Sequence, residues 1–228
     1  MKIIFFALLL SIFASQSSLA GGIALSSTRV IYDGNKKEAS LTINNKNKTE
    51  EFLVQSWIDD MAGNKKTPFI ITPPLFKLDP EKNNVLRIVN INPGLPQDRE
   101  SVYWVNVKAI PSKSDDSENK NVLQIAVRTR IKLFYRPVGL KGDVKTAPHE
   151  LHFTRSGNQI RVDNPTVFNI TFNQFFVNER EIEKSGMVPA KGSLNITLPA
   201  GVSTISKIKF NTINDFGSSA EMLTKNIN

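Results

Sequence analysis

The sequence contains no cysteine and only two histidines among its 228 residues. The absence of cysteine excludes thiol catalysis, thiolate metal sites and a disulfide framework. With so few histidines, the usual residues for acid–base chemistry and metal ligation are scarce. A nucleophile elbow, a phosphate-binding loop and a dinucleotide fingerprint are also lacking. The composition, with 40% hydrophobic and 22% charged residues, is that of an ordinary globular protein with room for one or two domains.

The two histidines, His149 and His152, stand in the tetrapeptide HELH, which superficially resembles a helical zinc motif. Their spacing is three positions where that motif needs four, Pro148 precedes them and a predicted strand follows. In a strand, neighbouring side chains point to opposite faces, so the pattern would not converge on a metal. We therefore expect no metal site and no cofactor.

A long apolar run occurs only at the N-terminus. Met1-Lys2 is a short positive start, residues 3–13 form an apolar run of 11, and Ser18-Leu19-Ala20 supplies small residues before a cut ahead of Gly21. A membrane anchor is the weaker interpretation, because eleven residues at about 1.5 Å each do not span the roughly 30 Å hydrocarbon layer. Residues 1–20 are therefore predicted to be a cleaved secretory signal peptide, and the mature chain is expected to be exported and soluble.

The chain is basic, with 29 Lys and Arg against 21 Asp and Glu and a net charge of +8. These basic residues are spread along the chain, without an aromatic and basic platform that could stack bases. Nucleic acid is therefore not an expected partner. The charge favours solubility, with a few cations positioned for an anionic group.

Short apolar or alternating runs recur between turn signals, and helical periodicity is lacking, which predicts an all-β protein. We expect one immunoglobulin-like sandwich, with strands at 23–32, 39–44, 52–59, 69–72, 75–78, 85–90, 102–110 and 122–135. A hinge containing proline and glycine is predicted at 137–142. A smaller second sandwich is expected in strands at 151–154, 159–163, 169–177, 193–198 and 206–211. The predicted domains are residues 21–136 and residues 143–228.

The predicted strand at 122–135 is unusually long, since strands average about 5 to 6 residues. Apolar side chains and one threonine occupy its odd positions, and polar or basic side chains occupy most of its even positions. Its own domain can cover only about half of this apolar stripe. It is either a bent strand that serves both sheets of its sandwich or a strand lent to a partner by β-augmentation. The polar loop at 111–121 favours the second interpretation, because it would leave the start of the strand free to move.

Five ordered motifs are spread over the chain. They are STRVIYDG at 27–34, TPPLFKL at 72–78, DRESVYW at 98–104, IKLFYRP at 131–137 with NVLQIAV at 121–127 before it, and INDFG at 213–217. Together they resemble the PapD-like periplasmic pilus chaperones over essentially the whole mature chain. The eleven-residue loop and the lack of cysteine resemble the short-loop branch, which serves rod-like adhesive fimbriae.

The resemblance implies two immunoglobulin-like domains arranged as a boomerang. It also implies a periplasmic chaperone that binds, folds and caps fimbrial or pilus subunits by donor-strand complementation and delivers them to an outer-membrane usher. Such a protein would not be an enzyme. Its donor side chains would be Leu123, Ile125 and Val127.

The resemblance also assigns roles to charged residues. Arg29 and Lys132 match two cleft cations that anchor the C-terminal carboxylate of the bound pilus protein. Glu100, Arg136 and Asp215 match a salt-bridge network between the domains, which would orient the cleft without touching that partner.

A secreted carbohydrate-binding or hydrolytic β-sandwich is the alternative. It would need a concave aromatic or carboxylate site, whereas Trp57 and Trp104 lie within predicted strands, where core packing is expected. A pilus subunit is less consistent with the sequence, because pilins have one domain and this chain has two. An uncovered strand edge would also favour self-association of the free protein.

Overall fold

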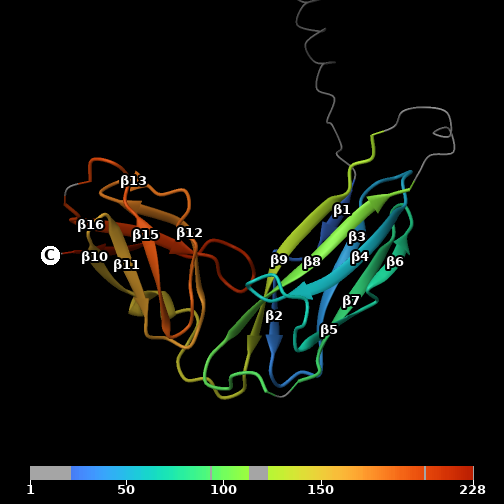
Figure 1. Cartoon of the computed structure of the whole chain (residues 1–228), viewed down its shortest axis with the longest axis horizontal. Helices are drawn as coiled ribbons and strands as arrows, with labels where there is room; N and C mark the ends of the chain where they lie inside the picture. The colour runs from blue at the N-terminus through green and yellow to red at the C-terminus, as the bar shows by residue number, and fades with distance from the viewer. Residues whose placement is uncertain (1–21, 93, 113–122, 203, 228) are drawn as a thin grey trace, which may run out of the picture.

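Two β-sandwich lobes joined at an angle make up the protein, as a computed structural model shows (Figure 1). The structure describes residues 22–92, 94–112, 123–202 and 204–227, so the predicted signal peptide at 1–20 lies outside the described residues. Each lobe has its own hydrophobic core. The all-β prediction and the prediction of two sandwiches are therefore confirmed.

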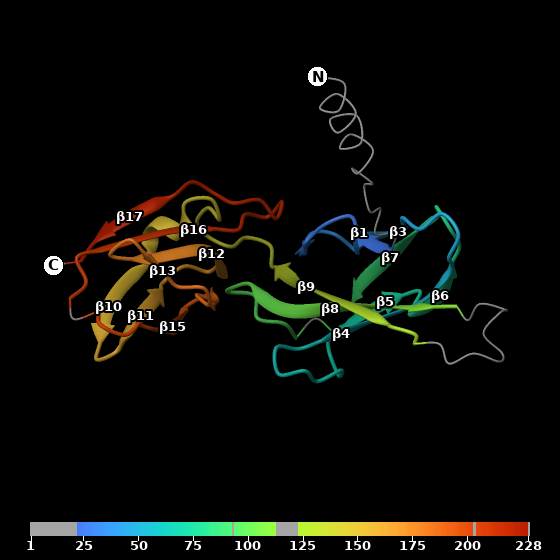
Figure 2. The ribbon, with the colours of Figure 1, turned by 90° about the horizontal axis from the view of Figure 1, so that it is seen from above.

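The first lobe consists of two sheets. One sheet holds, in spatial order, β1 (Ile23–Leu25), β3 (Ala39–Asn45), β7 (Asn83–Asn90) and β5 (Phe69–Thr72). The other holds β2 (Arg29–Asp33), β9 (Val127–Arg136), β8 (Ser101–Pro111), β4 (Phe52–Asp59) and β6 (Leu75–Leu78). All neighbours are antiparallel except β2 and β9, which run parallel. Figure 2 shows β9 continuing from the lobe junction along β8 toward the far end of this lobe.

Alternating side chains explain why these sheets pack face to face. Fully buried residues come from alternate positions of facing strands and include Leu41, Ile43, Val54, Leu86, Ile88, Val105 and Leu133. Pro73 and Pro74 separate β5 from β6, which lie in different sheets. The prolines therefore mark the point where the chain passes from one sheet to the other.

The prediction of one strand over residues 23–32 is wrong. The chain forms β1 in one sheet and β2 in the other, with the polar residues Ser26, Ser27 and Thr28 between them. Ser26 still bonds to β3, since its amide donates to the Thr42 carbonyl at 2.9 Å. The chain then leaves that sheet, and the next strand pairs with β9.

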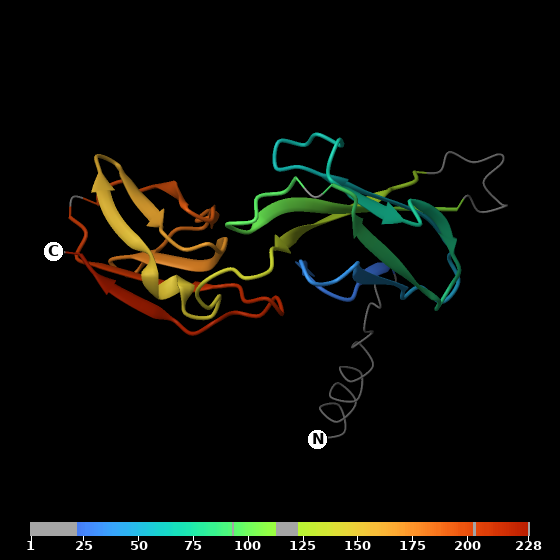
Figure 3. The same cartoon turned by 90° about the horizontal axis from the view of Figure 1, so that it is seen from below.

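The second lobe is a smaller sandwich (Figure 3). One sheet holds β10 (His152–Ser156), β11 (Gln159–Asn164) and β15 (Gly192–Thr197). The other holds β13 (Arg180–Glu181), β12 (Ile170–Val177), β16 (Lys207–Thr212) and β17 (Leu223–Asn226), and β14 (Met187–Val188) also pairs with β12. Aromatic side chains fill the core, with Phe172, Phe175 and Phe210 in mutual contact.

Four short elements of the second lobe were not predicted. The two-residue strands β13 and β14 are too short to show a period, and β17 has a mixed, largely polar sequence. The fourth is the 3₁₀ helix η2 (Ala147–Glu150), which carries His149, while His152 opens β10.

The predicted strand at 122–135 is wrong at its start. Strand structure begins at Val127, and residues 123–126 form none, while Val122 lies outside the described residues. The reason is the lack of a neighbouring strand, since the ladder with β8 ends at the pair Ala109 and Val127. The interpretation of a bent strand that serves both sheets is also wrong, because β9 belongs to one sheet only.

Candidate functional site

The two faces of β9 have different surroundings. Ile131, Leu133 and Tyr135 point into the core of the first lobe and are buried. The alternate positions point to the outer face of the sheet, where Lys132 and Phe134 approach the second lobe. The sequence thus places cations and an aromatic ring at the junction of the lobes because a strand alternates its side chains.

Arg29 and Lys132 lie side by side, paired in the parallel ladder of β2 and β9. Nη1 of Arg29 donates a hydrogen bond to the Ile213 carbonyl at 3.0 Å. The Arg29 guanidinium carbon lies 5.2 Å from the centroid of the Phe134 ring. Nζ of Lys132 donates to Oγ1 of Thr171 at 3.3 Å. Both cations therefore extend from the first lobe to the second, at the base of the cleft between them.

Neither cation forms an ion pair with another described residue. Nε of Arg29 is buried and has no hydrogen-bond partner. Burial lowers the pKa of Arg29, and the charges of Asp215 and Glu100 partly offset this effect. Burial, and then the nearby charge of Arg29, lowers the pKa of Lys132 to about 8. Two neighbouring cations that are partly desolvated and lack a counter-ion are suited to binding a carboxylate.

An open strand edge begins next to this pair. β2 pairs only with Lys132 to Arg136 of β9. Residues 127–131 therefore bond to β8 on one side and, among the described residues, to no strand on the other. Their free amide and carbonyl groups can bond to an added strand.

The three predicted donor side chains lie at the other end of this open edge, at Val127 and just before it. Leu123, Ile125 and Val127 are 84%, 66% and 60% exposed, respectively. They continue the odd-numbered series that, further along β9, faces the core. Large apolar side chains of one series are seldom exposed to this extent. Three of them in one stripe therefore indicate an interaction site.

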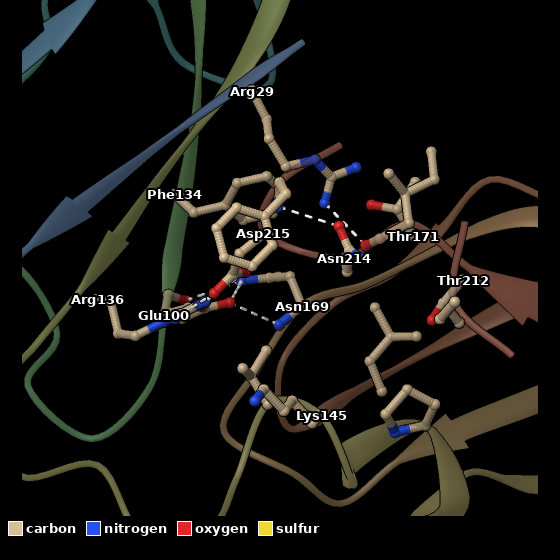
Figure 4. A pocket seen from close by; sticks show the side chains of 16 residues that line it. Arg29, Glu100, Phe134, Arg136, Lys145, Asn169, Thr171, Thr212, Asn214 and Asp215 are labelled. Atoms are coloured by element: carbon tan, nitrogen blue, oxygen red, sulfur yellow. Dashed lines mark hydrogen bonds and ion pairs between the residues drawn. The ribbon is translucent and has the colours of Figure 1, made fainter. Parts of the chain in front are cut away.

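The predicted salt-bridge residues come together from both lobes (Figure 4). Nε of Arg136 lies 2.7 Å from Oε1 of Glu100, and Nη1 and Nη2 of Arg136 lie 2.7 and 2.9 Å from the two carboxylate oxygens of Asp215. The backbone amide of Asn169 donates to Oε2 of Glu100 at 2.8 Å. These contacts connect the residue before β8 and the end of β9 in the first lobe to the residue before β12 and the turn after β16 in the second.

The charges of this network depend on one another. Burial raises the pKa of Glu100, and the charge of Arg136 partly opposes that rise. Burial disfavours the charged Arg136, but its hydrogen bonds and charge interactions with Asp215 and Glu100 raise its pKa overall. The network is only partly buried, and we expect it to fix one geometry more than it adds stability. We therefore expect these residues to hold the relative orientation of the lobes.

Gly217 brings the Asp215 turn close to the first lobe. It has a φ of +82°, and a Cβ atom at this position would clash with Oγ1 of Thr28. Only glycine combines this conformation with such a close approach. The last residue of the INDFG motif is therefore required by the contact between the lobes.

Replacing Arg136 by alanine is expected to lower the free energy of unfolding by about 3–5 kcal/mol, because the Glu100 carboxylate would remain buried without a counter-ion. The double variant Glu100→Gln/Arg136→Ala should recover part of this loss. Arg161→Ala is the matched control, since its exposed pair with Asp163 should contribute less than about 1 kcal/mol. Urea unfolding measures the stability of all three variants. Equal effects of Arg136→Ala and Arg161→Ala would contradict the role of Arg136 as the counter-ion of the buried Glu100.

A cavity of about 370 Å³ lies between the lobes beside the network (Figure 4). Arg29 and Phe134 line it from the first lobe, and Thr171, Asn214 and Lys145 line it from the second lobe and the segment before η2. Of the cation pair, Arg29 lines this cavity, and Lys132 is not among its lining residues.

Several contributors to the site were not predicted from the sequence. Thr171, Asn169 and the Ile213 carbonyl act through long-range contacts that have no local sequence signal. The prediction that Trp57 and Trp104 pack in the core is wrong. Both lie on the outer face of the sheet, where they stack against basic side chains.

The part of the chain that the structure describes contains neither a metal-binding cluster nor a membrane-spanning helix. That part contains no group of three or more acidic or histidine side chains that could hold a metal ion. None of its helices is long and apolar enough to cross a membrane.

Known proteins resemble this chain over almost its whole length. The family model described as pili and flagellar-assembly chaperone, PapD N-terminal domain, matches residues 22–141, and that of the PapD C-terminal domain matches residues 146–223. The probable fimbrial chaperone LpfB of Escherichia coli O157:H7 is 84% identical over 227 residues, covering 100% of this chain and 98% of the relative. The chaperone protein LpfB of Salmonella typhimurium is 69% identical over 223 residues, covering 97% and 96%.

Solved structures give the same result. A chain in the complex of the Salmonella enterica SafA pilin with the SafB chaperone has a TM-score of 0.83 and 27% identity, covering 92% of this chain and 99% of that one. The periplasmic chaperone SfaE has a TM-score of 0.78 and 39% identity, covering 90% and 100%. These matches give no support to the carbohydrate-binding or hydrolytic alternative.

Proposed function

Because the chain belongs to the PapD family of pilus-assembly chaperones, we propose that it binds fimbrial subunits in the periplasm, caps them by donor-strand complementation and delivers them to an outer-membrane usher. The observation that carries this proposal is the open edge of β9 beside the Arg29 and Lys132 pair. The function involves no covalent chemistry. Residues 1–20 would be the signal peptide removed on export.

The first step is the addition of a strand. A fimbrial subunit that lacks one strand of its own sandwich exposes an apolar groove with free backbone groups along its edges. Leu123, Ile125 and Val127 would fill that groove, and burying each of them contributes about 1.5–3 kcal/mol. Residues 123–126 would then extend β9, since the bound partner supplies the neighbouring strand that the free protein lacks. Before capture, the same edge would favour self-association of the chaperone.

The second step is the anchoring of the C-terminus of the fimbrial subunit. A carboxylate between Arg29 and Lys132 would form short, charge-assisted hydrogen bonds in a partly desolvated cleft. A fixed chain end determines the register, and a register shift of one residue would turn every side chain to the wrong face.

The two contacts together determine the strand direction. A strand that bonds to residues 127–131 and ends beside Lys132 must run in the same direction as β9. β2 already runs parallel to β9 on the same edge, and the added strand would lie in line with it. The Glu100, Arg136 and Asp215 network would keep the second lobe at the angle that leaves this edge accessible.

Capture of fimbrial subunits is expected to weaken as the pH rises from 7 to 9. In the protein without a bound partner, the pKa of Lys132 is about 8. Below this pH the ammonium is available to the carboxylate, and above it the charge is lost. Affinity should fall by up to about tenfold per pH unit above 8, until the higher pKa of the bound form is reached. Titration calorimetry across this range measures the effect. The variant Lys132→Arg should show a flat profile, and an equally steep fall in that variant would contradict the role of Lys132.

An affinity pull-down from the native periplasm tests the function. The tagged mature chain and its Arg29→Ala/Lys132→Ala variant are compared, and the captured proteins are identified by mass spectrometry. We expect the unmodified chain alone to recover small β-rich fimbrial subunits. Equal recovery by the folded double variant, or no recovery by either while the subunits are expressed, would overturn the proposal.

A further inference from the structure

The outer face of β4, β8 and β9 carries two tryptophans covered by cations. The Arg130 guanidinium carbon lies 4.3 Å from the Trp104 ring centroid, and that of Arg128 lies 5.5 Å from the Trp57 ring. Lys132 approaches the Trp104 ring from further away, at 5.8 Å, and Lys65 lies as far from the Trp57 ring as Arg128 does, at 5.5 Å. Stacking on an aromatic ring holds a guanidinium flat and leaves its N–H groups free to bond at the edge.

Arg128 and Arg130 have no counter-ion in the part of the chain that the structure describes. Both are exposed, and neither forms a hydrogen bond or an ion pair there. Asp59 is the one acidic residue at an outward-facing position of β4, β8 and β9, and it is 5% exposed. Its Oδ2 atom accepts a hydrogen bond from the Asn106 amide at 3.0 Å. The two arginines, here named the arginine stripe, therefore present unneutralised charge.

The arginine stripe lies on the open edge of β9. Residues 127–131 are the segment without a second neighbouring strand among the described residues, and Arg128 and Arg130 are its two outward-facing positions. A strand bound there lies about 4.8 Å away and presents every second side chain to the same face. Two of its side chains, two residues apart, would therefore lie beside the stripe.

We propose that the arginine stripe selects fimbrial subunits whose C-terminal strand carries acidic side chains two residues apart on its outer face. This inference rests on the proposed function, since it requires the strand to occupy the open edge. The pair of Arg29 and Lys132 would then recognise the chain end that all such partners share, and the stripe would distinguish one partner from another. Opposite charges on neighbouring strands are favourable, whereas like charges are unfavourable.

Synthetic peptides test this inference directly. Each peptide is a twelve-residue strand with a free C-terminus and the same apolar residues at alternate positions. The two outer-face positions nearest the C-terminus carry both Glu, both Gln or both Lys, and a second set has the register shifted by one residue. Titration calorimetry measures their affinities for the unmodified mature chain, Arg128→Gln/Arg130→Gln, Lys132→Ala and the charge-matched control Lys36→Gln/Lys37→Gln, whose lysines lie in the exposed turn after β2.

The unmodified chain and the control should prefer the Glu peptide to the Gln peptide by about 2- to 30-fold in one of the two registers. The arginine double variant should lose this preference while still binding the Gln peptide. Single variants Arg128→Gln and Arg130→Gln, which each retain one stacked cation, give the same test if the double variant does not fold. Each should lose part of the preference.

The possible failures are distinguishable. Lys132-dependent binding with equal affinities for Glu and Gln peptides would overturn the arginine stripe and leave the proposed function in place. A preference that persists without the arginines, or that disappears in the control, would also overturn it. Binding that Lys132→Ala leaves unchanged, or no binding of any peptide, would overturn the proposed function and this inference with it.

Discussion

Lys132→Ala is expected to reduce the affinity for a fimbrial subunit by about 10- to 150-fold, the loss that corresponds to one hydrogen bond with a charged partner. The ammonium lies beside Arg29 and forms no ion pair with the described residues of the free protein. The C-terminal carboxylate of the bound partner would therefore be its counter-ion. Surface plasmon resonance with an immobilised fimbrial subunit measures this loss, and most of the loss should be in the dissociation rate.

The same substitution should leave the free protein as stable as before or more stable. Burial lowers the pKa of Lys132 to about 8, below its ordinary value of 10.5, so the charged form is disfavoured in the folded state at neutral pH. Thermal unfolding at pH 7 provides this control. Lys132→Arg should retain most of the affinity because it retains the charge. Unaltered affinity of Lys132→Ala for the fimbrial partner would contradict the anchoring role of Lys132.

Ile125→Asp is expected to have the second large effect. In the free protein the Ile125 side chain is 66% exposed, so the substitution should not change the stability of the chaperone. In the complex it would place a carboxylate in an apolar groove. The lost burial alone corresponds to about 1.5–3 kcal/mol, or roughly 10- to 150-fold in affinity, and the buried charge adds to it.

Gln124→Asp is the matched control for this variant. Gln124 is also exposed and is adjacent in sequence, but it has the opposite parity and would point away from the groove. It carries the same added charge into the same segment. Equal losses of affinity in Gln124→Asp and Ile125→Asp would show that charge, and not the alternation of a donor strand, determines binding.

Local patterns predicted most of the strands, because each strand packs one face and so leaves a period of two in the sequence. β4, β5 and β6 have the bounds that the pattern predicted, at 52–59, 69–72 and 75–78. The pattern failed where pairing decides the outcome. Residues 23–32 look like one strand, yet the chain changes sheets at Ser26 to Thr28. Residues 123–126 have a strand sequence but no partner strand among the described residues of the free protein.

The site could be predicted only in part for a similar reason. Arg29 and Lys132 came from motifs that are far apart in sequence, and only the parallel pairing of β2 and β9 brings them together. The contacts with Thr171 and the Ile213 carbonyl depend on the orientation of the second lobe. Trp57 and Trp104 were expected in the core because they lie in strands. Alternation alone does not say which face of a strand is buried when both faces carry large side chains.

Hydrogen exchange of the backbone amides of residues 123–131, measured with and without a bound fimbrial subunit, tests the central claim most directly. In the free protein the amides of 123–126 have no ladder partner among the described residues, and one edge of 127–131 is open, so exchange should be fast at the start of this segment. Donor-strand complementation predicts strong protection across the segment once the partner is bound. A bound partner that leaves exchange there unchanged would contradict the account.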